Sequence, residues 1–188
     1  MKKIALILLV LITAGCTSSK PNFYQPIPVQ TNEITYPKFK HSVLLQPISL
    51  PTEMSKPQIV TLGKENFEVK IDEFNRWASA PDKLFQRVIN KNLSNYLPNA
   101  SIENQTPLRK NYEYAVAIEV NNIGGRLEEN AFLVASYFIK NKNGNIVKSG
   151  KLDESVAIEG GYEDYIPAQS RLLGALSAQI ASDLANLK

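Results

Sequence analysis

The sequence contains very little of the chemistry on which most enzymes and disulfide-stabilised proteins depend. Its 188 residues include one cysteine and one histidine. A single cysteine forms no disulfide within the chain, so a packed core has to stabilise the fold. These two residues also cannot supply a metal site rich in histidine or cysteine. The sequence therefore predicts no catalytic residue, no metal site and no cofactor, and we expect a protein that is not an enzyme.

His41 is the one residue around which a Ser/His/Asp triad could be built. It stands directly before an apolar run that is typical of a strand. We interpret His41 as a surface or sheet-edge residue, because a lone histidine at such a place needs no catalytic role.

The charge is small and dispersed. The formal net charge is +3 at pH 7, and both signs are scattered along the chain in small groups. A surface that binds phosphates needs a concentrated basic face. The sequence therefore predicts no nucleic-acid partner.

The first residues are typical of a bacterial export signal. Lys2 and Lys3 precede an apolar run over residues 4–12, and Thr13, Ala14 and Gly15 stand directly before Cys16. The run is shorter than the roughly 20 apolar residues that span a bilayer. Small residues before a cysteine resemble the bacterial lipobox, with Thr13 where leucine is usual. We expect residues 1–15 to be a signal peptide and Cys16 to carry lipid that anchors the chain to a membrane.

Two other interpretations of Cys16 remain. It could be an ordinary buried cysteine of an N-terminal helix, or the signal could be a plain secretory one that is cut near the same place. The second alternative would leave an unpaired thiol outside the cytoplasm, which is an unfavourable arrangement.

The rest of the chain divides into a tether and one domain. Residues 16–40 are polar and contain four prolines, which favour extended chain; Phe23 and Tyr24 could form a short edge strand there. Residues 41–188 are long enough for one domain with its own core, and no shift in composition divides them.

Periodicity predicts the elements of this domain. Strands are expected over residues 42–50, 59–62, 67–71, 112–120, 131–139 and from 146 onward, with a hairpin at Asn143–Gly144. One helix is expected over 79–97, begun by a capping box of Ser79 and Asp82, and another from Pro167. We predict a single α/β domain, bordering on α+β, with a mixed and mostly antiparallel sheet of about five strands covered by two main helices.

A proline-bracketed segment is the candidate partner-binding site. Prolines stiffen a segment and lower the ordering cost of binding, and methionine supplies adaptable contact area. A plain connection between two strands is the alternative. The residues of this candidate site are Leu50, Pro51, Met54, Lys56, Pro57 and Gln58.

Trp77, the only tryptophan, follows Arg76 and precedes the first predicted helix. We interpret the pair as a structural anchor, with Trp77 packed beneath that helix.

Several short motifs in order resemble the PqiC (YmbA) family of ABC-type transport auxiliary lipoproteins. They are Phe23-Tyr24, Leu50-Pro51, Lys56-Pro57-Gln58-Ile59-Val60, Phe74, Arg76-Trp77-Ala78 and the closing Leu176, Ser177, Ile180 and Ala181. One departure is Ser79-Ala80-Pro81, where the family often has Glu-Pro-Leu, so no role of that acid carries over.

The resemblance implies a fold similar to the anticodon-binding-like layer of the TolB amino-terminal domain. It implies a non-catalytic lipoprotein that works with an MCE-type periplasmic tunnel protein in lipid transport between membranes and so supports envelope integrity. Thr17 stands where aspartate would signal inner-membrane retention, so we expect the outer membrane, on its periplasmic face. The alternative is a structural or assembly lipoprotein of another envelope complex, and a homo-oligomer is left open.

Overall fold

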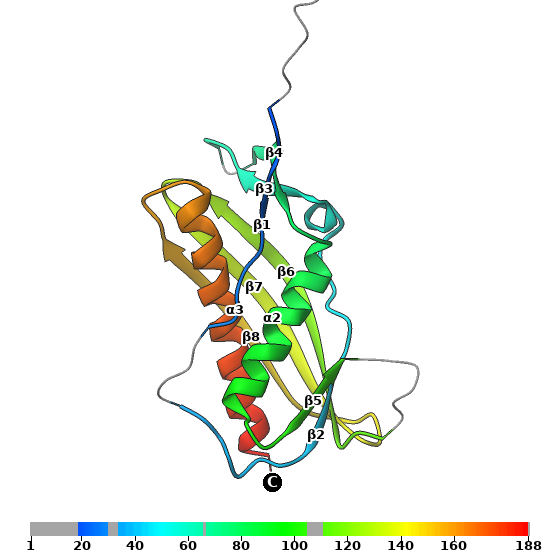
Figure 1. Cartoon of the computed structure of the whole chain (residues 1–188). Coiled ribbons are helices and arrows are strands. Elements are labelled where there is room, and N and C mark those ends of the chain that lie inside the picture. Colours follow the sequence, from blue (N-terminus) through cyan, green and yellow to red (C-terminus); the bar gives the residue numbers. More distant parts are fainter. Residues whose placement is uncertain (1–18, 30–33, 66, 105–110, 188) are drawn as a thin grey trace, which may run out of the picture.

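The computed structural model describes residues 19–29, 34–65, 67–104 and 111–187. This part of the chain forms two α-helices, a short 3₁₀ helix and eight strands, with runs of strands before each α-helix (Figure 1). The elements, in chain order, are β1 (Asn22–Tyr24), β2 (Ser42–Leu45), the 3₁₀ helix η1 (Thr52–Ser55), β3 (Gln58–Leu62), β4 (Val69–Trp77), α2 (Pro81–Tyr96), β5 (Ser101–Asn104), β6 (Tyr114–Arg126), β7 (Asn130–Asn141), β8 (Ile146–Ala157) and α3 (Tyr162–Ala185).

The larger sheet has five strands in the order β5-β2-β6-β7-β8. Strand β2 runs parallel to both β5 and β6, whereas β6, β7 and β8 follow one another as antiparallel hairpins. The β7–β8 turn uses Gly144 at φ 83°, a left-handed conformation that suits glycine, and the predicted hairpin there is confirmed. The predicted α/β domain, with two helices over a mixed five-stranded sheet, is also confirmed.

Both helices cover one face of this sheet (Figure 1). Strand β7 shows why, because its alternate residues Leu133, Tyr137 and Ile139 are fully buried while their neighbours are only half-buried. Apolar stripes on the helices, which include Leu84 and Leu173, complete the core.

The hairpin predicted at 59–62 and 67–71 belongs to a second, smaller sheet in the order β1-β4-β3. Strand β4 pairs antiparallel with β3 and parallel with β1, so β1 forms an edge. This sheet lies at one end of the molecule, and the C-terminus lies at the other (Figure 1).

The helix starts differ from the sequence prediction. Ala80 is the N-cap of α2 and no side chain caps the helix, so the predicted capping box of Ser79 and Asp82 is wrong. Pro81 opens the helix and has no N–H, which removes one donor that a cap would serve.

Helix α3 begins at Tyr162, five residues before the predicted start, and Pro167 lies inside it. Its start is stabilised by acids within the first turn. Asp164 Oδ2 accepts a 2.8 Å hydrogen bond from the Gly160 N–H, and Glu163 Oε1 accepts one of 3.1 Å from the Gly161 N–H. These acids satisfy free donors and complement the helix dipole.

The extended residues after β1 lie across the two helices rather than hanging free. The N–H of Ile27 donates to Ser170 Oγ in α3 at 3.1 Å, and the N–H of Val29 donates to Asn92 Oδ1 in α2 at 2.9 Å. Asn92 in turn donates to Ser177 Oγ at 3.4 Å, and both side chains are fully buried. The segment Gln25–Val29 is therefore fixed to the domain by a buried polar network.

Candidate functional site

The 50–58 segment, which holds the predicted partner-binding residues, connects β2 to β3 and contains η1. Pro51 caps η1, and its carbonyl accepts hydrogen bonds from the Met54 N–H at 3.0 Å and from Ser55 Oγ at 3.1 Å. The Pro57 carbonyl accepts a 2.7 Å hydrogen bond from the Trp77 N–H. The segment is thus a hydrogen-bonded turn with a defined shape.

Its apolar residues face inward more than the sequence suggests. Leu50 and Met54 are half-buried and pack against the core, and Met54 contacts a small space shared with Trp77 and Phe85. The residues that remain exposed are Thr52, Glu53, Ser55, Lys56 and Pro57. Gln58 begins β3 and donates a 3.2 Å hydrogen bond to Glu73. Any partner surface on this segment is therefore polar, with Met54 acting as its internal support.

Trp77 lies directly beneath this turn and the first helix. Its side chain is buried and meets the ring of Phe85 in α2 edge to face, at 5.5 Å between centroids and 87°. The neighbouring Arg76 points the other way, since its guanidinium donates to the carbonyl and carboxylate of Glu73 at 2.8 and 3.1 Å. Trp77 thus joins β4 to the 50–58 segment and to α2, whereas the Arg76 guanidinium bonds to Glu73 of its own strand.

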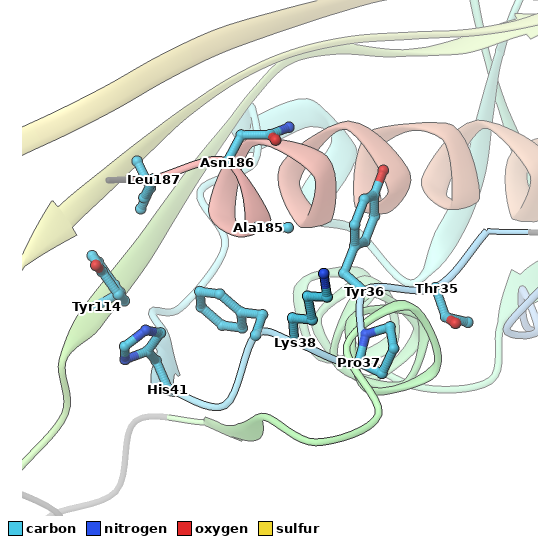
Figure 2. A pocket seen from close by; sticks show the side chains of 10 residues that line it. Thr35, Tyr36, Pro37, Lys38, His41, Tyr114, Ala185, Asn186 and Leu187 are labelled. Atoms are coloured by element: carbon cyan, nitrogen blue, oxygen red, sulfur yellow. The ribbon is translucent and has the colours of Figure 1, made fainter.

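A second candidate site is a cavity of about 450 Å³ at the end of the molecule that holds the C-terminus (Figure 2). His41 and Tyr114 line one side of it, and residues 185–187 at the end of α3 line another. Lys38 contributes the cationic side chain shown among the sticks of Figure 2.

The His41 environment in this cavity is that of a strand-edge contact. Its Nδ1 lies 2.8 Å from Glu113 Oε1, and its ring lies edge-on to Phe39 and Tyr114 at 5.0 and 5.5 Å. The hydrogen bond from His41, followed by that from the Ser42 N–H, lowers the pKa of Glu113 below its ordinary value. The Ser42 hydroxyl accepts a hydrogen bond from the Glu113 N–H at 3.1 Å. The cluster joins the starts of β2 and β6.

No metal centre can be assembled from the part of the chain that the structure describes, because no three His, Cys, Asp or Glu side chains gather there. Cys16, the predicted lipid attachment residue, lies outside the described residues. Among the described helices, none is long and apolar enough to cross a bilayer.

Sequence reasoning missed one group of residues. It treated the apolar residues at 67–71 as an ordinary strand, yet Phe67 in the β3–β4 connection and Val69 and Ile71 in β4 are exposed, as are Phe23 and Phe74. In the sequence, Phe67, Val69 and Ile71 alternate with Glu68, Lys70 and Asp72, and this alternation does not show whether another layer covers the apolar face.

The comparisons with known proteins agree with this architecture. The fold as a whole is that of a crystal structure of an uncharacterised protein, at 17% identity and a TM-score of 0.74 over 88% of this chain and 99% of that one. It is also that of a DUF330 protein from Xanthomonas campestris, at 13% identity and a TM-score of 0.70 over 87% of this chain and 95% of that one. Identities this low show a common fold. The comparison with curated proteins finds no match.

A family model settles the membership. The model of the ABC-type transport auxiliary lipoprotein component matches residues 23–181, from β1 almost to the end of α3. The chain belongs to this family, as the resemblance in the sequence indicates.

Proposed function

We propose that this chain is a non-catalytic outer-membrane lipoprotein subunit of an MCE-type intermembrane lipid transport system, where it docks the periplasmic tunnel protein. The observation that carries the proposal is the family match over residues 23–181, because it takes in both sheets and both helices. A subunit with an auxiliary role needs an anchor and a docking surface, and it needs no reactive centre.

The proposed anchor is lipid on Cys16. Each CH₂ group of an acyl chain buried in the bilayer contributes about 0.8 kcal/mol, so two or three chains hold the protein firmly. In Cys16→Ala we expect no incorporation of labelled fatty acid and an uncut precursor, while the folded domain melts as in wild type. Fatty-acid incorporation equal to wild type would contradict the anchor.

The proposed docking surface is the exposed side of the 50–58 segment. The hydrogen bonds to Pro51 and Pro57 hold its backbone, and Met54 supports it from beneath. A surface already ordered in the free protein loses little conformational entropy when a partner binds. The side chains of Lys56 and Pro57 are exposed on this side of the segment.

The test is affinity recovery of the lipidated chain from its native envelope, with the co-purified proteins identified by mass. The variant Lys56→Glu with Pro57→Ala changes the docking surface and keeps the carbonyl that Trp77 uses. The matched control Lys142→Glu makes the same charge change in the exposed β7–β8 turn at the far end. We expect wild type and Lys142→Glu to recover the tunnel protein, and the double variant to lose most of it.

Two outcomes would count against the proposal in different ways. Equal recovery by both variants would remove the 50–58 segment from the contact. Recovery of the subunits of some other envelope complex by wild type, with no tunnel protein, would favour the alternative of a structural or assembly lipoprotein.

A further inference from the structure

Exposed apolar side chains gather at one end of the domain. Of nine large hydrophobic side chains exposed in the described chain, five belong to the three-stranded sheet and its β3–β4 connection. Phe67 is 87% exposed, Phe23 63% and Phe74 49%. Exposed apolar patches often mark surfaces that contact a partner protein or a membrane. We name as the apical patch Phe23, Phe67, Val69, Ile71 and Phe74.

The chain enters the domain at the same end (Figure 1). Cys16 stands three residues before Ser19 and six before β1, so it lies within about 11 Å of the first and about 20 Å of the second at full extension. Strand β1 is paired with β4, and the following residues are bonded to both helices. The short link therefore keeps this end of the domain near any bilayer that holds Cys16.

We propose that the apical patch inserts into the interfacial region of the bilayer that carries the Cys16 lipid; this inference rests on the anchor proposed above. Phenylalanine side chains lie well at the boundary between headgroups and acyl chains, where their rings leave water. The patch and the lipid then fix the domain upright, with the cavity beside His41 facing away from the membrane.

The charges at this end indicate an apolar contact in preference to an electrostatic one. Residues 19–24 and 56–77 carry five basic and four acidic side chains, so no basic field is present to attract anionic headgroups. We therefore expect the contact to form on zwitterionic vesicles and to be insensitive to salt.

The experiment places a fluorescent reporter at each end of the lipidated, full-length chain. Lys64→Cys labels the β3–β4 connection beside the patch, and Asn143→Cys labels the exposed turn at the far end. The labelled proteins are reconstituted in phosphatidylcholine vesicles that contain nitroxide lipids. We expect quenching several-fold stronger at position 64 than at 143, and unchanged by high salt.

A second pair of variants tests the apical patch itself. Phe67→Ser with Phe74→Ser removes two exposed rings, and Ile146→Ser with Val147→Ser removes two exposed apolar side chains from the far end as a matched control. In the Lys64→Cys background, the first pair should abolish most of the quenching and the control should leave it unchanged. Thermal melts show that each variant is folded.

Each other outcome overturns the inference. Equal quenching at positions 64 and 143 in vesicle-bound, lipidated protein would refute the insertion and leave the anchor intact. Quenching at 64 that survives loss of both phenylalanines, or that requires anionic lipid, would show that the apical patch does not make the contact. A reporter unquenched in vesicles but shielded in native envelopes would assign the patch to a protein partner. If the mass of the purified chain shows no lipid on Cys16, the anchor and the inference both fail.

Discussion

The hydroxyl of Tyr162, the first residue of α3, donates a 2.9 Å hydrogen bond to Asp72 Oδ2 in β4, ninety residues earlier. Asp72 also accepts from the N–H groups of Phe74 and Asn75 at 2.8 and 2.9 Å, and from the Asn75 side chain at 2.9 Å. One carboxylate therefore shapes β4 and fastens the small sheet to the main body of the domain.

Asp72→Asn should destabilise the protein at neutral pH and hardly at all in acid. Burial alone would raise the pKa of Asp72, but hydrogen bonds from Asn75, Phe74 and Tyr162 lower it below its ordinary value. Because this pKa is lower in the folded than in the unfolded protein, the ionised carboxylate stabilises the fold fully at pH values above the unfolded-state pKa. The stabilisation is lost as the pH falls through the folded-state pKa. Since the site is partly exposed, we expect Asp72→Asn to lower the free energy of unfolding by about 1–2 kcal/mol at pH 7. This difference from wild type should shrink below about pH 4. Denaturant unfolding at both pH values measures it.

The control for this prediction is Glu73→Gln. Glu73 is in the same strand, but its hydrogen bonds to Gln58 and Arg76 are exposed. Such contacts contribute roughly 0–1 kcal/mol. If Glu73→Gln lowered the free energy of unfolding as much as Asp72→Asn does, the hydrogen bonds to Asp72 would not be the ones that stabilise this part of the fold.

Asn92→Ala should release the segment that crosses the helices. It removes the acceptor of the Val29 N–H and the partner of Ser177 in a buried place, which costs about 1–3 kcal/mol. Hydrogen exchange over Gln25–Val29 should become faster, while exchange in β6 and β7 changes little. Asn90→Ala, on the exposed side of the same helix, serves as the control.

A second substitution tests the same segment by crowding it. A Cβ on Gly174 would lie 2.8 Å from Cγ2 of Val29, closer than side chains tolerate. Alanine would otherwise favour the helix by about 1 kcal/mol over glycine. We expect Gly174→Ala to accelerate proteolysis within Gln25–Val29, and Val29→Ala to restore protection in the double variant. A single variant as resistant as wild type would show that the segment does not lie against Gly174 in solution.

Trp77→Ala should be among the most destabilising single changes. It leaves a void beside Phe85 and withdraws support from Met54, and large-to-small changes of an aromatic core residue cost about 3–5 kcal/mol. Arg76→Ala next to it should cost less than about 1 kcal/mol, because its bonds to Glu73 are on the surface. Equilibrium unfolding followed by circular dichroism compares the two variants. Tryptophan fluorescence cannot follow Trp77→Ala, because Trp77 is the only tryptophan.

The periodic parts of the sequence predicted their elements well. The stripe from Leu84 to Leu93 became α2, and the alternation from Tyr114 to Val120 became the first half of β6. These patterns predict helices and strands because the apolar residues recur on the face of the element that packs against the core. Strand β5 was missed, since a strand of four residues pairing at a sheet edge leaves little period to detect.

The relations between distant segments could not be predicted in this way. Nothing near Asn92 in sequence indicates that its amide accepts from the N–H of Val29, and nothing near Asp72 indicates Tyr162. The exposure of the apical patch could not be predicted from the strand pattern for a similar reason. Apolar residues in a strand predict burial only if another layer covers them, and layers are a property of the whole fold.

The placement of Gln25–Val29 across both helices has a consequence for the order in which the parts of the domain fold. This segment is synthesised early, but its contacts Asn92, Ser170 and Gly174 are synthesised much later. It therefore has nothing to pack against until nearly the whole chain has emerged, and its docking is expected to be a late, non-local step of folding.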